Sequence, residues 1–288
     1  MNIDNKAWLT NYQVSFNCNS YLYHFTSVEK ATLILDGNSL RFSKITNMND
    51  TLESKPKFGL TGINSPEKVK TILNRIKEIN NKYIQLLCFT TDSDVKLHTN
   101  SEKIKYNDYT GRGFSLPRMW AQYANNNDGV CFVFDKQKLF ALVDRELGAN
   151  QIKRDRINYS SQYDRNPTRF EYESLAFLEE AENELSKSIQ YVTFIKDNTS
   201  YTDVNYFTKL EDWKTENEFR ILAYGEDEFF IKNVKSALVG IIIGEQIKSN
   251  NEKIIKLFCK DVCEIKKITF TYEGCMLENI YDDDDEEV

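Results

Sequence analysis

Residues 22–29 read LYHFTSVE, a strand pattern that continues directly into the start of a helix. The aromatic and aliphatic side chains of residues 22–25 favour a short strand. Thr26 is followed three residues later by Glu29, the spacing of a capping box, and Gly37 then ends the predicted helix. A strand that leads at once into a helix predicts a fold that combines both kinds of element.

Further strand and helix patterns follow on both sides of this unit. Strands are predicted at residues 40–43, 84–90, 129–134, 218–224, 229–232, 237–243 and 264–272. Helices are predicted at residues 66–79, 119–123, 136–146, 165–188 and 251–258. Strand 229–232 is expected to pair with strand 218–224. The mixture predicts one α+β domain over residues 21–275 with helical insertions, preceded by an extension (1–20) and followed by an acidic, disordered tail (276–288).

Composition narrows the class of protein. The 288 residues carry 37 basic and 44 acidic side chains, a net charge of −7, and residues 282–287 hold six of the acidic ones. Without this tail, which we expect to be dispensable for folding, the chain is close to neutral, which argues against a basic nucleic-acid clamp. We find no apolar run long enough to span a bilayer and no secretory signal, so we expect a cytoplasmic protein without membrane contact.

Common catalytic and metal-binding motifs are missing. The chain contains no P-loop, dinucleotide-binding glycine motif, zincin helix or nucleophile elbow. The six cysteines are scattered, and Cys259, Cys263 and Cys275 lack the spacing of a zinc knuckle. We therefore expect reduced thiols and no metal.

His24 is one of only two histidines and lies where the first strand meets the first helix. A helix N-terminus favours anionic or ribosyl-phosphate ligands. On a strand, Tyr23 and Phe25 point away from His24. The alternative is a structural histidine that hydrogen-bonds a backbone carbonyl.

A second candidate is the strand near Glu218. If the strand pattern begins before it, Glu216, Glu218 and Arg220 share one face, and Phe219 and Ile221 share the other. Such a face is either exposed to solvent or forms the polar wall of a cleft, because buried unpaired charges are costly.

Two further groups have simpler interpretations. Asp50 and Glu53 form an acidic turn that binds a cation or, more simply, caps a helix. Trp120 and Tyr123 share a helix face, which is more typical of a core than of a ligand platform.

Several short motifs occur together in a fixed order. They are 23–27 (YHFTS), 40–43 (LRFS), Asn49, Asp50 and Glu53, 88–90 (CFT), 119–123 (MWAQY), Gly129-Val130, and Trp213 with Glu216, Glu218, Phe219 and Arg220. In this order they resemble the bacterial family called domain of unknown function 2971, over residues 21–244. The family's name implies no activity.

The opening strand with its histidine and the late Glu-x-Glu strand also resemble, more loosely, the ADP-ribosyltransferase fold. This resemblance implies a mixed sheet core, NAD as substrate, His24 as ribose ligand and Glu218 as the catalytic carboxylate. Glu216 matches the residue that orients the acceptor. The same resemblance implies a cofactor-binding set of His24, Thr26, Ser27, Arg41, Trp120 and Tyr123. The Ser-Thr-Ser motif of the arginine-modifying branch is missing.

The expected function is therefore ADP-ribosyl transfer from NAD to an unknown protein or nucleic acid, or hydrolysis of NAD. The resemblance implies a bacterial toxin or phage-defence role. One alternative is a non-enzymatic module that senses a nucleotide or binds a partner. A weaker alternative is a metal-dependent nuclease built on Asp50, Glu53 and Glu218.

Overall fold

The computed structural model describes residues 20–50, 52–53, 55–93, 109, 111–161, 169–180, 184–259 and 262–280. The expected extension, apart from Ser20, therefore lies outside the described residues, as do residues 281–288 of the expected tail (276–288) and the polar segment 94–108.

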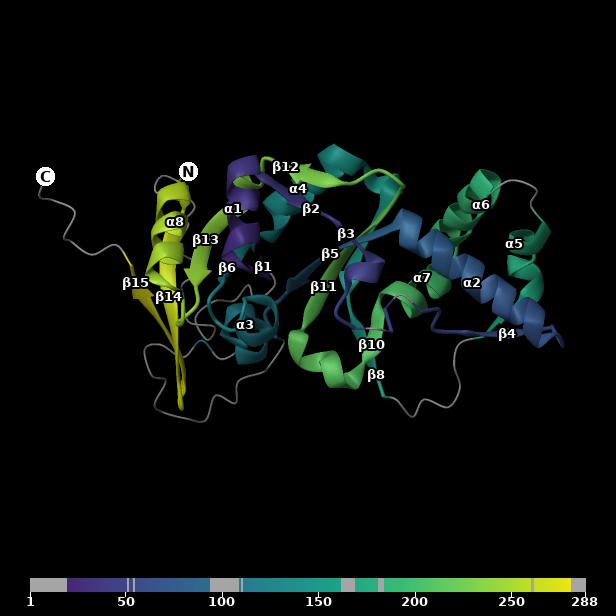
Figure 1. Cartoon of the computed structure of the whole chain (residues 1–288), viewed down its shortest axis with the longest axis horizontal. Coiled ribbons are helices and arrows are strands. Elements are labelled where there is room, and N and C mark those ends of the chain that lie inside the picture. Colours follow the sequence, from purple (N-terminus) through teal and green to yellow (C-terminus); the bar gives the residue numbers. More distant parts are fainter. Residues whose placement is uncertain are drawn as a thin grey trace, which may run out of the picture.

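A mixed nine-stranded sheet forms the centre of the α+β fold (Figure 1). Its strands are β1 (Tyr21–Thr26), β3 (Ser43–Lys44), β5 (Ile84–Thr90), β6 (Val130–Asp135), β7 (Ile152–Arg156), β11 (Glu218–Tyr224), β13 (Leu238–Ile243), β14 (Glu264–Thr271) and β15 (Gly274–Asn279). The order is β15-β14-β13-β6-β1-β5-β11-β7, with β3 beside β5. Only β13 and β14 are parallel within this described sheet.

Short strand pairs and helices surround this sheet. The pairs join β2 (Ser39–Arg41) with β12 (Phe230–Lys232), β4 (Gly59–Thr61) with β9 (Arg169–Glu171), and β8 (Asn158–Ser160) with β10 (Thr208–Leu210). The helices are α1 (Val28–Gly37), α2 (Pro66–Tyr83), α3 (Pro117–Tyr123), α4 (Lys136–Leu147), α5 (Phe177–Glu180), α6 (Glu184–Asp197), α7 (Thr199–Tyr206) and α8 (Ser249–Cys259).

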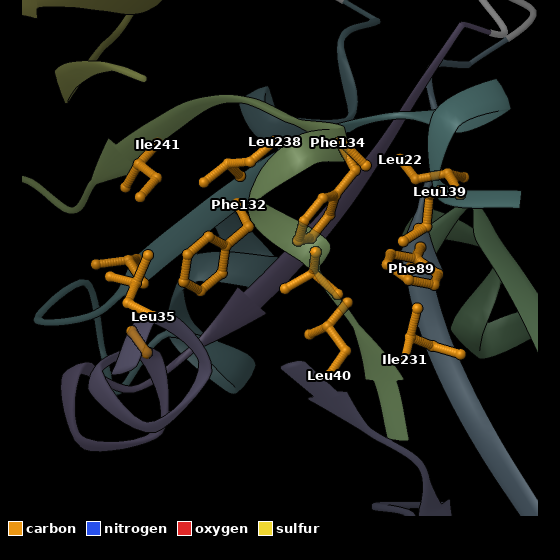
Figure 2. Packing of buried hydrophobic residues seen from close by; sticks show 14 of the residues in the cluster. Leu22, Leu35, Leu40, Phe89, Phe132, Phe134, Leu139, Ile231, Leu238 and Ile241 are labelled. Atoms are coloured by element: carbon orange, nitrogen blue, oxygen red, sulfur yellow. The ribbon is translucent and has the colours of Figure 1, made fainter. Parts of the chain in front are cut away.

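One face of the sheet is apolar. Phe89, Phe132 and Phe134 pack there against side chains of α1, α4 and the β2–β12 pair, such as Leu35 and Leu139 (Figure 2). Helix α8 lies beside α1 in the same layer (Figure 1). Burial of this much apolar surface is the main stabilising contribution to a fold of this kind.

The opposite face has two separate cores. Over β1 and β6, Trp120 of α3 packs with Tyr23 and Phe25. Over β5 and β11, the helices α2, α6 and α7 form a second core with Leu86 and Leu222. Between these two cores the first residues of β11 carry the charged side chains of the candidate site.

Four details differ from the sequence-based predictions. Strand β12 pairs with β2 rather than with β11. Strand β15 extends to Asn279, so the folded domain continues beyond 275. Ser27, not Thr26, caps α1, because its hydroxyl accepts a hydrogen bond from the amide of Lys30. Within the predicted helix at 165–188, the described residues form β9, a 3₁₀ helix (Tyr172–Leu175), α5 and the start of α6, and α7 was not predicted.

Candidate functional site

Arg220 on β11 is the centre of a buried group of charges. Its side chain is fully buried, and its guanidinium donates to both carboxylate oxygens of Glu53, at 2.8 and 2.5 Å. It also donates to Glu218 at 2.6 and 3.2 Å and to the carbonyl of Tyr206 at 2.8 Å. Two carboxylates therefore share one guanidinium, the group best suited to such paired hydrogen bonds.

Lys209 of β10 adds a second cation to this group. Its ammonium lies 2.7 Å from Glu218, 2.9 Å from Glu216 and 3.6 Å from Glu53. Lys57 lies 3.6 Å from Glu53 on the other side. We call these six residues, Glu53, Lys57, Lys209, Glu216, Glu218 and Arg220, the Arg220 network. Its three carboxylates are matched by three cations.

A tight turn brings Glu216 and Glu218 onto the same side. Glu216 was predicted to lie on the same strand as Glu218. It instead ends a 3₁₀ helix, η6 (Glu211–Glu216), just before β11. Asn217 adopts a left-handed conformation with φ of 46°, which asparagine tolerates better than most residues. Its side-chain amide donates to the carbonyl of Thr91, and its own carbonyl accepts from the amide and the hydroxyl of Thr91, which fixes the turn to the end of β5. Both carboxylates consequently reach Lys209.

The neighbouring charges decide the ionisation of Glu218. Burial alone would raise the pKa of this carboxyl, but the opposing effect of Arg220 and Lys209 is larger and lowers the pKa to about 2. The pKa of Glu53 is lowered against the same burial effect, mainly by Arg220. The pKa of Lys209 is raised because its acidic neighbours outweigh burial. All three groups are therefore charged at neutral pH.

Aromatic side chains border the network. The hydroxyl of Tyr123 on α3 donates to Glu216 at 2.7 Å. The hydroxyl of Tyr159 accepts from the backbone amide of Glu218 at 2.9 Å, and burial raises the pKa of Tyr159 to about 12. The centre of the Trp213 ring lies 5.1 Å from the ammonium of Lys209 and 5.0 Å from the guanidinium of Arg118. These rings limit the contact of the network with solvent.

His24 lies on the other face of the sheet from Glu218. In the strand register Tyr23 is opposite Thr90, and Thr90 is opposite Glu218, so these three side chains share one face. His24, the next residue after Tyr23, points to the apolar face and contacts the ring of Phe89. The expectation that His24 and Glu218 hold one ligand from a common cleft is wrong for this arrangement.

The imidazole of His24 instead connects two strands. Its Nδ1 lies 3.2 Å from the carbonyl oxygen of Cys88, and the Nδ1–H tautomer donates to it. Strands β1 and β5 pair only at Tyr23 and Thr90, and the His24 ring provides a further contact where the strands separate. Burial lowers the pKa of His24. This is the structural alternative that the sequence left open.

The other predicted NAD-binding residues are dispersed. Thr26 is buried and Ser27 caps α1, both beyond His24 along the chain. Arg41 is on β2, where its exposed side chain lies 3.8 Å from Glu228. Trp120 is fully buried and donates to the carbonyl of Phe114 at 2.7 Å, so it is a core residue. Of the predicted cofactor-binding set, only Tyr123 contacts the network.

The two acidic residues of the expected turn, Asp50 and Glu53, have different roles. Asp50 accepts a hydrogen bond from the amide of Leu52, as a capping side chain does, whereas Glu53 enters the network. Among the described residues, no group of three or more His, Cys, Asp and Glu side chains is arranged to hold a metal ion. Two surface pockets of about 690 and 400 Å³ lie along α6 and α7, away from the network.

Sequence reasoning missed two cations of the network, Lys57 and Lys209. Neither lies in a motif. Lys57 is far from β11 in the chain, whereas Lys209 lies in the short strand β10, only a few residues before β11. The only available signal was that Glu216 and Glu218, if buried, require partners.

The fold and the network define an α+β domain with a buried, charge-balanced polar centre on its central sheet. Residues 119–221 match the model of a family described as "Protein of unknown function (DUF2971)". This match confirms the resemblance over a stretch that contains Tyr123, Lys209 and most of the Arg220 network. No curated protein and no solved structure matches the chain. Within the described residues, no helix has the length and apolar character to cross a bilayer.

Proposed function

We propose that the protein is an ADP-ribosyltransferase-like enzyme that breaks the bond between nicotinamide and ribose in NAD, with Glu218 as its essential carboxylate. The observation that supports this most is the state of Glu218. The carboxylate is ionised and is oriented by Arg220 and Lys209. Glu218 is the first residue of β11, and its side chain is 6% exposed to solvent. A fixed anion of this kind suits a reaction whose transition state gains positive charge.

The chemistry assigns separate tasks to the two carboxylates. When the bond breaks, its electron pair leaves with nicotinamide, and the ribose becomes a cation resembling an oxocarbenium ion. Glu218 stabilises that cation electrostatically. Water or an acceptor group then attacks the ribose carbon and loses a proton. Glu216, bonded to Tyr123 and Lys209, would orient this attacking group.

The test is nicotinamide release from NAD by the purified chain. We expect Glu218→Gln to reduce the rate by about a hundredfold or more, since one preorganised charge contact is removed. Glu216→Gln should reduce hydrolysis less, because its role is to orient the acceptor. Glu211→Gln is the matched control, because Glu211 is an exposed residue of the same 3₁₀ helix. Wild-type protein that releases no nicotinamide, or Glu218→Gln with full activity, would refute the proposal.

The second candidate is a non-enzymatic module that binds a nucleotide or a protein partner. The balance of charge favours it, because each carboxylate of the network already has a cation partner. In this case Glu218→Gln lowers the melting temperature, and NAD binds, if at all, without turnover. Calorimetric titration with NAD beside the release assay separates the two functions. The nuclease alternative has less support, because Asp50 caps a turn and Glu53 is bound to Arg220.

A further inference from the structure

Thr90 is a buried residue whose hydroxyl has no partner. The residue is 1% exposed, and its Oγ1 forms no hydrogen bond with any residue that the structure describes. Such a group is uncommon in folded proteins, because burial removes its bonds to water without replacing them. The unpaired hydroxyl therefore lowers the stability of the fold, and its presence at this buried position needs an explanation.

The strand register places this hydroxyl beside the proposed catalytic carboxylate. Thr90 on β5 is directly opposite Glu218 on β11, so the two side chains leave the sheet on the same face. Opposed residues in antiparallel strands have Cβ atoms about 5 Å apart. Both oxygens of Glu218 accept from Arg220 or Lys209, and the Thr90 hydroxyl forms no bond to this neighbour.

Hydrogen bonds between the neighbouring residues Thr91 and Asn217 fix the position of Thr90 relative to Glu218. Thr91 donates through its amide and its hydroxyl to the carbonyl of Asn217, each at 3.0 Å. The side-chain amide of Asn217 donates back to the carbonyl of Thr91 at 2.7 Å. Three hydrogen bonds thus join the ends of β5 and β11, and a pair of groups held in this way is suited to a two-point contact with one ligand.

The structure above this face is polar. Helix α3 packs on β1, whereas η6 leads into β11, and β5 lies between these two strands. The contact of α3 with η6 therefore crosses β5 on the side to which Thr90 points. It includes the bond from Tyr123 to Glu216 and those from Arg118 to the Asp212 carbonyl and the Thr215 hydroxyl. Polar contacts of this type can exchange with water when the two segments separate.

We propose that Thr90 is the second ribose contact of the enzyme, with its hydroxyl bonded to one hydroxyl of the NAD ribose while Glu218 binds another. The inference rests on the proposed function. It places the ribose on the face of Tyr23 and Thr90, which is the face opposite His24. Thr90 binds the ribose equally in the ground state and in the transition state, so its loss affects KM more than kcat.

The experiment compares Thr90→Val, Thr90→Ser and Thr91→Val in nicotinamide release and in thermal unfolding. Valine keeps the shape of threonine without the hydroxyl. We expect Thr90→Val to raise the KM for NAD about tenfold with kcat nearly unchanged, and with a melting temperature equal to or above that of the wild type. Thr90→Ser keeps the hydroxyl and should retain the wild-type KM. Thr91→Val is the matched control, and it should lower the melting temperature because a formed hydrogen bond is lost.

The outcomes separate this inference from the proposed function. If the wild type releases nicotinamide and Thr90→Val has the same KM, only the assignment of Thr90 is wrong. If Thr90→Val loses as much thermal stability as Thr91→Val and keeps its KM, the hydroxyl is structural and the assignment is again wrong. If the wild type releases no nicotinamide, the proposed function fails, and the role of Thr90 fails with it.

Discussion

Two buried polar clusters lie next to each other in this protein, and they differ in charge. One is the Arg220 network under β11. The other, which we call the tyrosine network, consists of Asn80, Tyr191, Tyr201 and Tyr206 between α2, α6 and α7. Its hydroxyls and the Asn80 side-chain oxygen are joined at 2.8 to 3.3 Å. Tyr206 belongs to both regions, because its backbone carbonyl accepts from Arg220.

The difference shows what each cluster contributes. The tyrosine network is neutral at pH 7, because phenols ordinarily ionise only near pH 10 and burial raises their pKa further. It connects three helices with hydrogen bonds, each of which contributes about 1 kcal/mol to stability. In the Arg220 network six charged groups are removed from water, and the cost of their desolvation offsets much of their mutual attraction. A buried group of this kind therefore seldom stabilises a fold more than well-packed apolar side chains would.

Removal of the central cation should have the largest effect. In Arg220→Met the carboxylates of Glu53 and Glu218 lose their main partner while they remain buried. We expect a loss of about 3–5 kcal/mol in the free energy of unfolding, measured by urea titration. Tyr191→Phe is the comparison from the neutral cluster, and its expected loss is about 1–2 kcal/mol. Equal losses for the two variants would contradict the distinction between the clusters.

Acid should affect the charged cluster and leave the neutral one unchanged. The pKa of Glu218 is about 2 in the folded protein, against 4.5 for an unperturbed glutamate. Its contribution is therefore fully present above pH 4.5 and is lost as the pH falls towards 2. The shift corresponds to about 3 kcal/mol. Urea titrations between pH 7 and pH 3 should show a steeper loss of stability in the wild type than in Glu218→Gln. The same acid dependence in both proteins would contradict the assigned pKa.

Much of the sheet could be predicted from the sequence because its strands carry local signals. The apolar alternation of β11, the aromatic β1 and the capped α1 all follow from patterns within a few residues. The partner of β12 could not be predicted in this way. Its pairing with β2 joins segments almost two hundred residues apart, and no local rule specifies such a contact. Helix α7 was missed because its sequence, TSYTDVNY, has weak helical periodicity.

The candidate site was only half predictable for a related reason. Glu218 and Arg220 are two residues apart on one strand, so their common face follows from strand geometry. Glu53 lies in an acidic turn that the sequence marked without indicating its partner, and Lys209 lies in the three-residue strand β10, which carries no motif. The face of His24 relative to Glu218 depends on the order β1-β5-β11 and on its register. Neither can be read from a single sequence.

Substitution of His24 should have the smallest effect, and it tests whether His24 and Glu218 lie on opposite faces of the sheet. In His24→Leu the hydrogen bond to the Cys88 carbonyl is lost, and we expect a decrease of about 1 kcal/mol in stability at pH 7. Burial lowers the pKa of His24, so the folded protein keeps the ring neutral while the unfolded chain takes up a proton near pH 6.5. The wild type therefore loses stability as the pH falls from 7 to 5, and the difference from His24→Leu should narrow. Nicotinamide release should change little, since the side chain is on the other face from Glu218. A loss of turnover in His24→Leu as large as that in Glu218→Gln, with the fold intact, would return His24 to the site and contradict the face assignment.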